Sequence, residues 1–310
     1  MTRLSLLGGL VAGALVLASA IGAVRAETIP IAIGNDAAFA PFFVAQNRGL
    51  FTKAGLDIKL TRYAQGGEAL DAVVAGQAVL GGAADQTTII RLARTDGLRP
   101  LFIYEESATY LKAVARPAVT GPGDVKKLGI VKGTVSEYSA AKMLETFKIP
   151  RESVQFVTSG APEFPALLAR GDIDAYFAWE PWPTIGVRSG GKILMTSGEA
   201  GYAYTMWLTA SAAWLEKHEK DARAIMAVLA EANRQITADP AAAAEDVQAV
   251  TKLPAKDTLP LIRDLVFKVR DFSAEDRKSF GSIADFLVAQ KVTPTKVDVD
   301  RYLQAGFFKE

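Results

Sequence analysis

The sequence contains no cysteine and only one histidine, His218, among its 310 residues. Without cysteine the chain can form no disulfide, carry no lipid on a thiol and use no thiolate as a nucleophile. One histidine cannot build a zinc site of the usual kind, and neither a GxSxG elbow nor a phosphate-binding loop is present. We therefore expect a protein that is not an enzyme and that needs no metal or cofactor.

An excess of either charge is also missing, because 35 lysines and arginines face 34 aspartates and glutamates. A nearly neutral chain gives no electrostatic reason to expect a nucleic-acid partner. Internal repeats, low-complexity segments and long blocks of one charge are absent too, and glycine and proline are scattered. Two lobes suit a chain of this length, and the boundary between them must be a hinge rather than a flexible linker.

Charge is missing again from residues 4–24, a run rich in leucine, alanine, glycine and valine that follows Arg3. The run leads into Val24-Arg25-Ala26, which has small residues at the positions that a signal peptidase reads. Its length would also allow a membrane anchor, but the small-residue exit favours cleavage. We predict that residues 1–26 are a cleavable signal peptide and that the mature protein is periplasmic.

Short apolar runs alternate with segments of helical spacing from residue 27 onwards. One such segment places Ala140, Met143, Leu144 and Phe147 on a single face. Strands that alternate with helices of this length predict parallel sheets flanked by helices. The expected strands are residues 29–33, 56–60, 78–82, 101–104, 128–131, 154–157 and 173–179.

From about residue 211 the pattern changes to helix alone. The expected helices are residues 222–236, 240–250 and 275–289, and the last has Phe280, Ile283, Ala284 and Leu287 as its inner face. The preceding residues 273–276 fit a capping box. A helical tail of this kind must cover a sheet that is already folded, so we expect it to return to the first lobe.

Loops at four predicted strand ends carry polar and aromatic residues. Open α/β sheets bind ligands at the carboxyl ends of their strands, where loops lead into helix N-termini. Several N-termini at one cleft would favour an anionic group without a metal or a buried arginine. The candidate ligand-binding residues are Asn35, Asp36, Phe39, Asp85, Gln86, Thr87, Thr134, Ser136, Tyr138, Trp179, Glu180 and Trp182.

These loops also have a purely structural interpretation. Thr134 and Glu137 fit a capping box that satisfies their own backbone, and Asn35 and Asp36 suit an ordinary turn. The aromatic residues are of types that usually lie in a core. Glu180 stands among tryptophans and prolines, where a buried carboxylate needs a partner, either the ligand or a lysine or arginine across the lobes.

Four stretches follow one another in the order and spacing of a known family. They are PFFVAQNRGLFTKAGLDIKL (41–60), GGEALDAVVAGQAVLGGAADQ (66–86), DVKKLGIVKGTVSEYSAAKMLETFKI (124–149) and ALLARGDIDAYFAWEPWPT (166–184). They resemble the signatures of the sulfonate/nitrate/taurine family of ABC-transporter periplasmic substrate-binding proteins. The resemblance implies an α/β, two-lobed type II periplasmic-binding fold, each lobe a mostly parallel sheet flanked by helices, with a helical C-terminal tail on the first lobe.

The same resemblance implies the domain boundaries and the partners. Lobe I would comprise residues 27–108 and 205–310, lobe II would comprise 109–204, and the chain would cross between them near 104–112 and 202–208. A monomeric binding protein would hold one small-molecule ligand between the lobes. It would deliver that ligand to an ABC permease and its ATPase subunit, with only transient contact to the membrane complex.

The family leaves the ligand open. Helix N-termini with the hydroxyls of Thr87, Thr134 and Ser136 suit a small organic anion of the alkanesulfonate, taurine or nitrate class. The aromatic residues together with Glu180 suit a planar aromatic or pyrimidine-type ring. Contacts from both halves of the chain would shift a hinge from open to closed states with either ligand.

Two other classes of function are open at this point. A carboxylate-based hydrolase would need Asp36, Asp85 and Glu180 to share one cleft. A periplasmic ligand sensor would present the closed form of the same fold to a receptor.

Overall fold

Two five-stranded sheets form the framework of the computed structural model, which describes residues 27–304 and 306–308. The predicted signal peptide lies outside the described residues. The first sheet has the order β2-β1-β3-β10-β4, and β10 runs antiparallel to both of its neighbours. Its strands are β1 (Thr28–Ile33), β2 (Asp57–Arg62), β3 (Leu80–Ala84), β4 (Leu98–Ser107) and β10 (Tyr204–Ser211).

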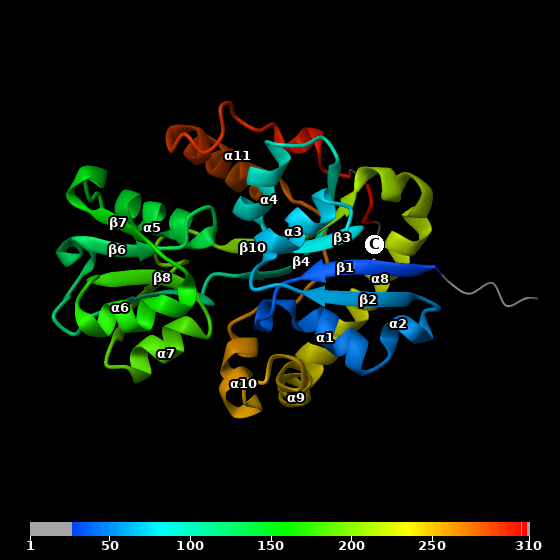
Figure 1. The fold of residues 1–310 in the computed structure, drawn as a ribbon, viewed down its shortest axis with the longest axis horizontal. Coiled ribbons are helices and arrows are strands. Elements are labelled where there is room, and N and C mark those ends of the chain that lie inside the picture. The colour runs from blue at the N-terminus through cyan, green and yellow to red at the C-terminus, as the bar shows by residue number, and fades with distance from the viewer. Residues whose placement is uncertain (1–26, 305, 309–310) are drawn as a thin grey trace, which may run out of the picture.

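The second sheet has the order β7-β6-β8-β5-β9, in which β5 is antiparallel to β8 and to β9. Its strands are β5 (Leu111–Ala115), β6 (Lys127–Ile130), β7 (Gln155–Thr158), β8 (Ala175–Trp179) and β9 (Lys192–Thr196). Each sheet with its helices is called a lobe below, lobe I for the first and lobe II for the second (Figure 1). The chain passes between the lobes at residues 108–110, the first crossing, and at residues 197–203, the second crossing.

Helices cover both faces of both sheets, as Figure 1 shows with α3, α4 and α11 on one side of the first sheet and α1, α9 and α10 on the other. In lobe I they are α1 (Ala40–Asn47), α2 (Leu50–Lys53), α3 (Gly66–Val74), α4 (Asp85–Leu92), α8 (Ala212–Ala238), α9 (Pro240–Thr251), α10 (Ala255–Arg263) and α11 (Ala274–Ala289). In lobe II they are α5 (Val135–Thr146), α6 (Phe164–Arg170) and α7 (Trp182–Arg188). Short 3-10 turns are Ala37–Phe39, Pro122–Asp124, Arg151–Ser153, Ala161–Glu163 and Val299–Arg301. Among the described residues, no helix is both long and apolar enough to cross a membrane.

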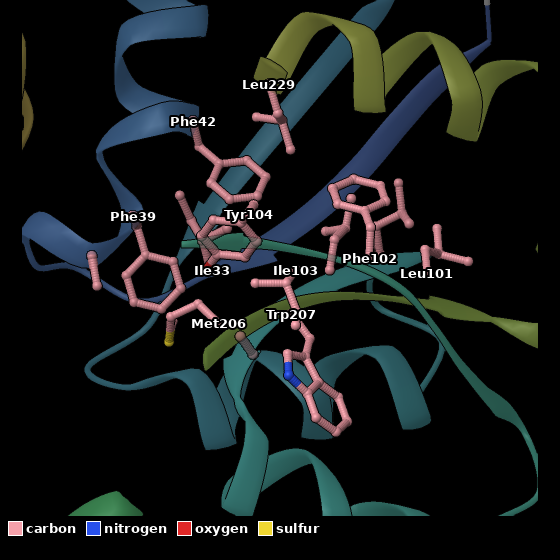
Figure 2. Packing of buried hydrophobic residues seen from close by; sticks show 14 of the residues in the cluster. Ile33, Phe39, Phe42, Leu101, Phe102, Ile103, Tyr104, Met206, Trp207 and Leu229 are labelled. Atoms are coloured by element: carbon pink, nitrogen blue, oxygen red, sulfur yellow. The ribbon is translucent and has the colours of Figure 1, made fainter. Parts of the chain in front are cut away.

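The core of lobe I has aromatic side chains on both sides of its sheet. On one side Phe42 of α1 meets the ring of Tyr104 edge-on, with 5.2 Å between the ring centroids. Trp207 of β10 is fully buried against Phe280 of α11, at 4.5 Å. Figure 2 shows Phe42 and Leu229 on one side of these strands and Trp207 on the other. The C-terminal helices are therefore part of the lobe I core.

The periodicity of the sequence predicts most of these elements. All the predicted strands are present within a few residues, and the inner face of α11 is buried as expected. The capping box before α11 is confirmed, since Ser273 Oγ accepts from the Asp276 N–H and Asp276 accepts from the Ser273 N–H. The alternation of strands and helices is therefore a sound guide to this fold.

One predicted side-chain position and three strands differ from the expectation. Phe147 does not join the inner face of its helix, because it follows the last residue of α5 and its side chain is 44% exposed. Strands β5, β9 and β10 have no counterpart among the predicted strands, although the crossings expected near 104–112 and 202–208 overlap β5 and β10. The apolar run of β9 is only residues 193–195, and most of its side chains are exposed or half-buried, as suits an edge strand.

We predict that Gly66 is needed for α3 to lie this close to β3. A Cβ at Gly66 would stand 2.9 Å from Ala83 Cα and 2.9 Å from Gly82 O, whereas a Cβ at Gly281 in α11 would meet nothing within 4 Å. Gly66→Ala should lower the free energy of unfolding by about 1–3 kcal/mol. Gly281→Ala should raise it by roughly 0.5–1 kcal/mol, because alanine favours helix. Urea unfolding of both variants checks this, and equal stabilities would contradict the close approach.

Candidate functional site

A cavity of about 60 Å³ lies between the two lobes. On the same measure one water needs about 10–15 Å³, so the cavity has room for a ligand of a few heavy atoms. Residues of both lobes and of the crossing line it: Asp36, Ala38, Phe39, Gln65, Gly66, Gly67, Ala84, Thr87, Tyr110, Leu111, Thr134, Val135, Trp179, Tyr204 and Met206.

The N-termini of three helices reach this cavity. The N-cap residues are Gln65 for α3, Ala84 for α4 and Thr134 for α5, and all three line the cavity. In a parallel sheet, the helix that follows each strand begins at the same edge of the sheet. Here that edge of lobe I and that edge of lobe II both contribute residues to the cavity. Gln65 and Ala84 provide no side-chain cap. The Gln86 N–H of α4 donates to Asp85 and the Ser136 N–H of α5 donates to Thr134, so an anion would be held by the other backbone N–H groups of these first turns.

The hydroxyl of Thr87 is the clearest polar group without a partner at this place. Thr87 lies in the first turn of α4, is only 5% exposed and lines the cavity. Its hydroxyl makes no hydrogen bond with any residue that the structure describes. Since no lysine or arginine is among the cavity-lining residues of the described chain, the donors for an anion are N–H groups and this hydroxyl.

Thr134 lines the cavity as well, but its hydroxyl is occupied. It accepts from the Ser136 N–H at 3.2 Å and donates to Val131 O at 2.8 Å. Glu137 accepts from the Gly133 N–H at 2.8 Å. The two side chains thus satisfy nearby backbone groups, but not as the expected capping box, because Thr134 accepts from Ser136 and Glu137 accepts from Gly133. Thr134 therefore brings backbone rather than hydroxyl to the cavity.

Asp36 also lines the cavity, and it differs from these threonines because its carboxylate offers only hydrogen-bond acceptors. Its Oδ1 accepts from the Ala38 N–H at 2.9 Å and from the Tyr110 hydroxyl at 3.2 Å. The same hydroxyl lies 3.1 Å from the main-chain oxygen of Glu180, so Tyr110 joins lobe I to lobe II. Burial raises the pKa of Asp36 to about 6, although both hydrogen bonds lower it.

An outer hollow of about 400 Å³ adjoins the cavity and shares Asp36, Gln65 and Trp179 with it. Asn35 and Trp182 line this outer hollow but not the inner cavity. Of the predicted aromatic residues, Phe39 and Trp179 thus line the inner cavity and Trp182 lines the outer hollow.

Glu180 has its partner inside the protein. It is 1% exposed, and its Oε1 lies 2.8 Å from Lys112 Nζ while Oε2 accepts from the Thr184 N–H at 3.0 Å. Lys112 also pairs with Asp264 Oδ2 of lobe I at 2.6 Å. Burial lowers the pKa of Lys112, but the two carboxylates outweigh it and the pKa is raised. Glu180 therefore pairs with a lysine of its own lobe, and the contact across the lobes is the one from Lys112 to Asp264.

Asp85 and Tyr138 lie against the second crossing and not in the cavity lining. Asp85 accepts hydrogen bonds from the Tyr202 hydroxyl and from the Thr205 N–H, the latter at 3.1 Å. Burial raises the pKa of Asp85 to about 6, against the lowering effect of these bonds. The Tyr138 ring packs on Tyr202 at 4.8 Å and on Phe286 of α11 at 5.1 Å. Both residues hold the second crossing and lie outside the cavity lining.

Ser136 and Gln86 are buried away from the cavity. Ser136 Oγ donates to Phe177 O at 2.8 Å and accepts from the Val131 N–H at 2.9 Å, which ties α5 to β6 and β8. The amide group of Gln86 makes no hydrogen bond with any described residue, yet Gln86 does not line the cavity. Among the predicted site residues, the structure therefore brings together Asp36, Phe39, Thr87, Thr134 and Trp179.

Several lining residues have no counterpart among the predicted site residues, notably Gln65, Gly66, Tyr110, Tyr204 and Met206. The glycine pair at residues 66 and 67, shortly after the predicted strand 56–60, was the available signal for the start of α3. The other three lie in or beside the crossings, where no local pattern marks a cavity wall. Within residues 27–304 and 306–308, no three acidic or histidine side chains gather closely enough to hold a metal ion.

Comparisons with known proteins agree on one family. A family model described as NMT1/THI5 like matches residues 36–243. The taurine-binding periplasmic protein of Escherichia coli strain K12 is 20% identical over 312 residues, covering 94% of this chain and 97% of that protein. The aliphatic sulphonate binding protein SsuA from Escherichia coli has a TM-score of 0.80 at 18% identity, over 91% of this chain and 99% of that chain. The alkanesulfonate-binding protein SsuA from Xanthomonas axonopodis pv. citri, bound to MOPS, has a TM-score of 0.77 at 20% identity, over 90% and 99%. These findings confirm the predicted family and fold class.

The pairing of Glu180 predicts a loss of stability when its carboxylate is removed. Glu180→Ala leaves Lys112 without its buried partner and should lower the free energy of unfolding by about 3 kcal/mol. Glu145→Ala is the control, because Glu145 is 70% exposed in its pair with Lys142 and should cost about 1 kcal/mol at most. Chemical denaturation measures both. A Glu180→Ala variant as stable as the wild type would show that the ion pair is not formed.

Proposed function

The chain belongs to the NMT1/THI5-like family, and on that premise we propose that it is the periplasmic substrate-binding component of an ABC importer. We propose that its ligand is a small organic anion of the alkanesulfonate or taurine class. The observation that carries this proposal is the cavity between the lobes, where three helix N-termini and the free hydroxyl of Thr87 meet. The names of the taurine- and sulfonate-binding relatives support the same ligand class.

A sulfonate suits these donors for a simple chemical reason. It keeps its negative charge at every pH of biological interest, and its three oxygens can accept from several N–H groups at once. Helix N-termini supply both the N–H groups and the positive end of the helix dipole. The cavity volume of about 60 Å³ restricts the bound group to a small one.

Closure of the hinge would complete the site. In this proposal lobe I comprises residues 27–108 and 205–310, lobe II comprises residues 109–204, and the ligand shifts the population towards the closed form. Ion pairs between the lobes support it: Lys112 with Asp264 at 2.6 Å and Arg188 with Asp257 at 2.7 Å. A permease with its ATPase subunit would receive the closed, monomeric protein after the leader 1–26 has been removed.

An aromatic ligand is the second candidate, and the outer hollow favours it. Trp179 and Trp182 line that hollow together with prolines and Leu253. A planar ring could stack there with a polar group at Asp36. This candidate would place most of the ligand outside the inner cavity.

We propose that the protein binds its ligand and does not catalyse a reaction on it. A carboxylate-based hydrolase would need Asp36, Asp85 and Glu180 in one cleft. Of the three, Asp36 lines the cavity, Glu180 is paired with Lys112, and Asp85 holds the second crossing.

A thermal-shift panel on residues 27–310 tests the ligand class. Taurine, short alkanesulfonates, nitrate, aromatic sulfonates and aminopyrimidines would each be added at increasing concentration. Binding should stabilise the protein by about 2.7 kcal/mol at a hundredfold excess over Kd, which raises the melting temperature by degrees. We expect the shift with taurine or short alkanesulfonates. A shift with aminopyrimidines alone would contradict the anion site and favour the aromatic candidate.

The proposal also predicts a difference between two neighbouring threonines. Thr87→Val removes the free hydroxyl of the cavity and should weaken sulfonate binding about tenfold, or 1.4 kcal/mol, without loss of stability. Thr88→Val is the matched control, because the Thr88 hydroxyl donates to Ala84 O at 2.9 Å inside the helix. It should affect stability and leave affinity unchanged. Calorimetric titration separates the two, and an unchanged affinity in Thr87→Val would exclude the hydroxyl from the site.

A further inference from the structure

The cavity is chemically two-sided. The N-termini of α3, α4 and α5 and the Thr87 hydroxyl offer donors, whereas Asp36 offers a carboxylate. The Oδ1 atom of Asp36 accepts the hydrogen bonds from Ala38 and Tyr110, and Oδ2 accepts none from the described residues. Asp36 is half-buried and lines the cavity, so Oδ2 is the carboxylate oxygen left for a ligand.

The other buried carboxylates near the hinge differ from Asp36 in this respect. Glu180 is neutralised by Lys112 at 2.8 Å. Asp85 accepts hydrogen bonds on both of its oxygens, from Gln86, Tyr202 and Thr205. Asp36 alone lines the inner cavity, and no cationic side chain is part of that lining in the described chain. A plain anion would enter a space that already holds a carboxylate, and only the helix N-termini, without any cationic side chain of the described lining, would offset the repulsion.

We propose that Asp36 is the specificity-determining residue of the site and that it binds the ammonium group of an amino-alkanesulfonate zwitterion. The sulfonate would lie at the helix N-termini and Thr87, and the ammonium would donate to Asp36 Oδ2. A zwitterion satisfies both sides of the cavity, which a plain alkanesulfonate cannot do. This inference rests on the proposed function and names the ligand within its class.

Protonation of Asp36 would remove its negative charge and with it the preference for an amino-alkanesulfonate over a plain alkanesulfonate. The pKa of Asp36 lies near 6, because burial disfavours its charge. The titratable groups that face it from neighbouring elements are Tyr104 and Glu105 on β4, Tyr110 on the first crossing, Tyr204 on β10, and Glu180 beyond Tyr110. Arg62 on β2 hydrogen-bonds the adjacent Asn35, and Asp264 after α10 pairs with Lys112.

These neighbours do not compete with Asp36 for the role. Burial raises the pKa of each tyrosine well above its usual range, so all three stay neutral. Burial also raises the pKa of Glu105, which lies outside the cavity lining and accepts from Tyr204 at 3.2 Å. Asp85, with a pKa that is also near 6, faces the second crossing. Asp85 titrates in the same range, so the comparison with Asp36→Asn, in which Asp85 is unchanged, isolates the contribution of Asp36.

The test compares taurine with 1-propanesulfonate, in which a methyl group replaces the ammonium at nearly equal size. Calorimetric titration of the wild type, Asp36→Asn and Asp172→Asn between pH 5 and pH 8 gives the ratio of the two affinities. Asp172 is the control carboxylate, 49% exposed in its pair with Arg170. At pH 7.5 the wild type and Asp172→Asn should bind taurine at least about tenfold more tightly than 1-propanesulfonate.

Two further results are expected if Asp36 binds the ammonium. The ratio should fall by up to about tenfold per pH unit below pH 6, because protonation neutralises Asp36. Asp36→Asn should abolish both the preference and its pH dependence while 1-propanesulfonate binds as before or more tightly. Because the pKa of Asp36 is raised in the folded protein, its charge costs stability above pH 6. The melting temperature of ligand-free Asp36→Asn at pH 7.5 should therefore be equal to or higher than that of the wild type.

The outcomes separate the inference from the proposed function. A wild type that binds 1-propanesulfonate as tightly as taurine, with a ratio independent of pH, would overturn the ammonium site and leave a sulfonate-binding protein. A preference for taurine that persists in Asp36→Asn would overturn the assignment of Asp36. Failure of the wild type to bind either sulfonate would overturn the proposed function and the inference with it.

Discussion

Parallel strands place the N-termini of the helices that follow them at one edge of a sheet, and in this chain two such edges face each other across two short crossings. The N-termini of α3 and α4 from lobe I and of α5 from lobe II therefore line one cavity. Gly66 allows α3 to approach β3 closely enough for this. Because backbone N–H groups supply the positive potential, an anion can be held without a basic side chain among the described lining residues.

The carboxylates near the two crossings have different partners and therefore different roles. Glu180 of lobe II and Asp264 of lobe I both pair with Lys112, so an ion pair joins the two lobes. Asp85 fixes the second crossing through hydrogen bonds. Asp36 keeps one oxygen free toward the cavity, and burial without a full set of partners raises its pKa to about 6. Glu180, Asp264 and Asp85 thus use their oxygens inside the protein, whereas Asp36 contacts the first crossing through Oδ1 and keeps Oδ2 without a described partner.

Local periodicity explains what could be predicted from the sequence. Neighbouring residues largely determine the strands and helices, and the order of these elements determines the sheet edge at which the loops lie. The expected loops therefore do contribute to the cavity, with Thr87 among its lining residues. Side-chain direction and pairing depend on distant parts of the chain. Ser136 donates to Phe177, 41 residues away, and Glu180 pairs with Lys112, 68 residues away. Tyr110 lies on a crossing whose neighbours in space are set only by the packing of the two lobes.

A crystal structure of residues 27–310 grown with taurine tests the central claim most directly, because it locates the sulfonate. The account predicts sulfonate oxygens within hydrogen-bond distance of the first-turn N–H groups of the helices at the cavity and of Thr87 Oγ1, with both lobes in contact with the ligand. A sulfonate found instead in the outer hollow beside Trp182, or on exposed basic side chains such as Arg94 and Lys132, would contradict it.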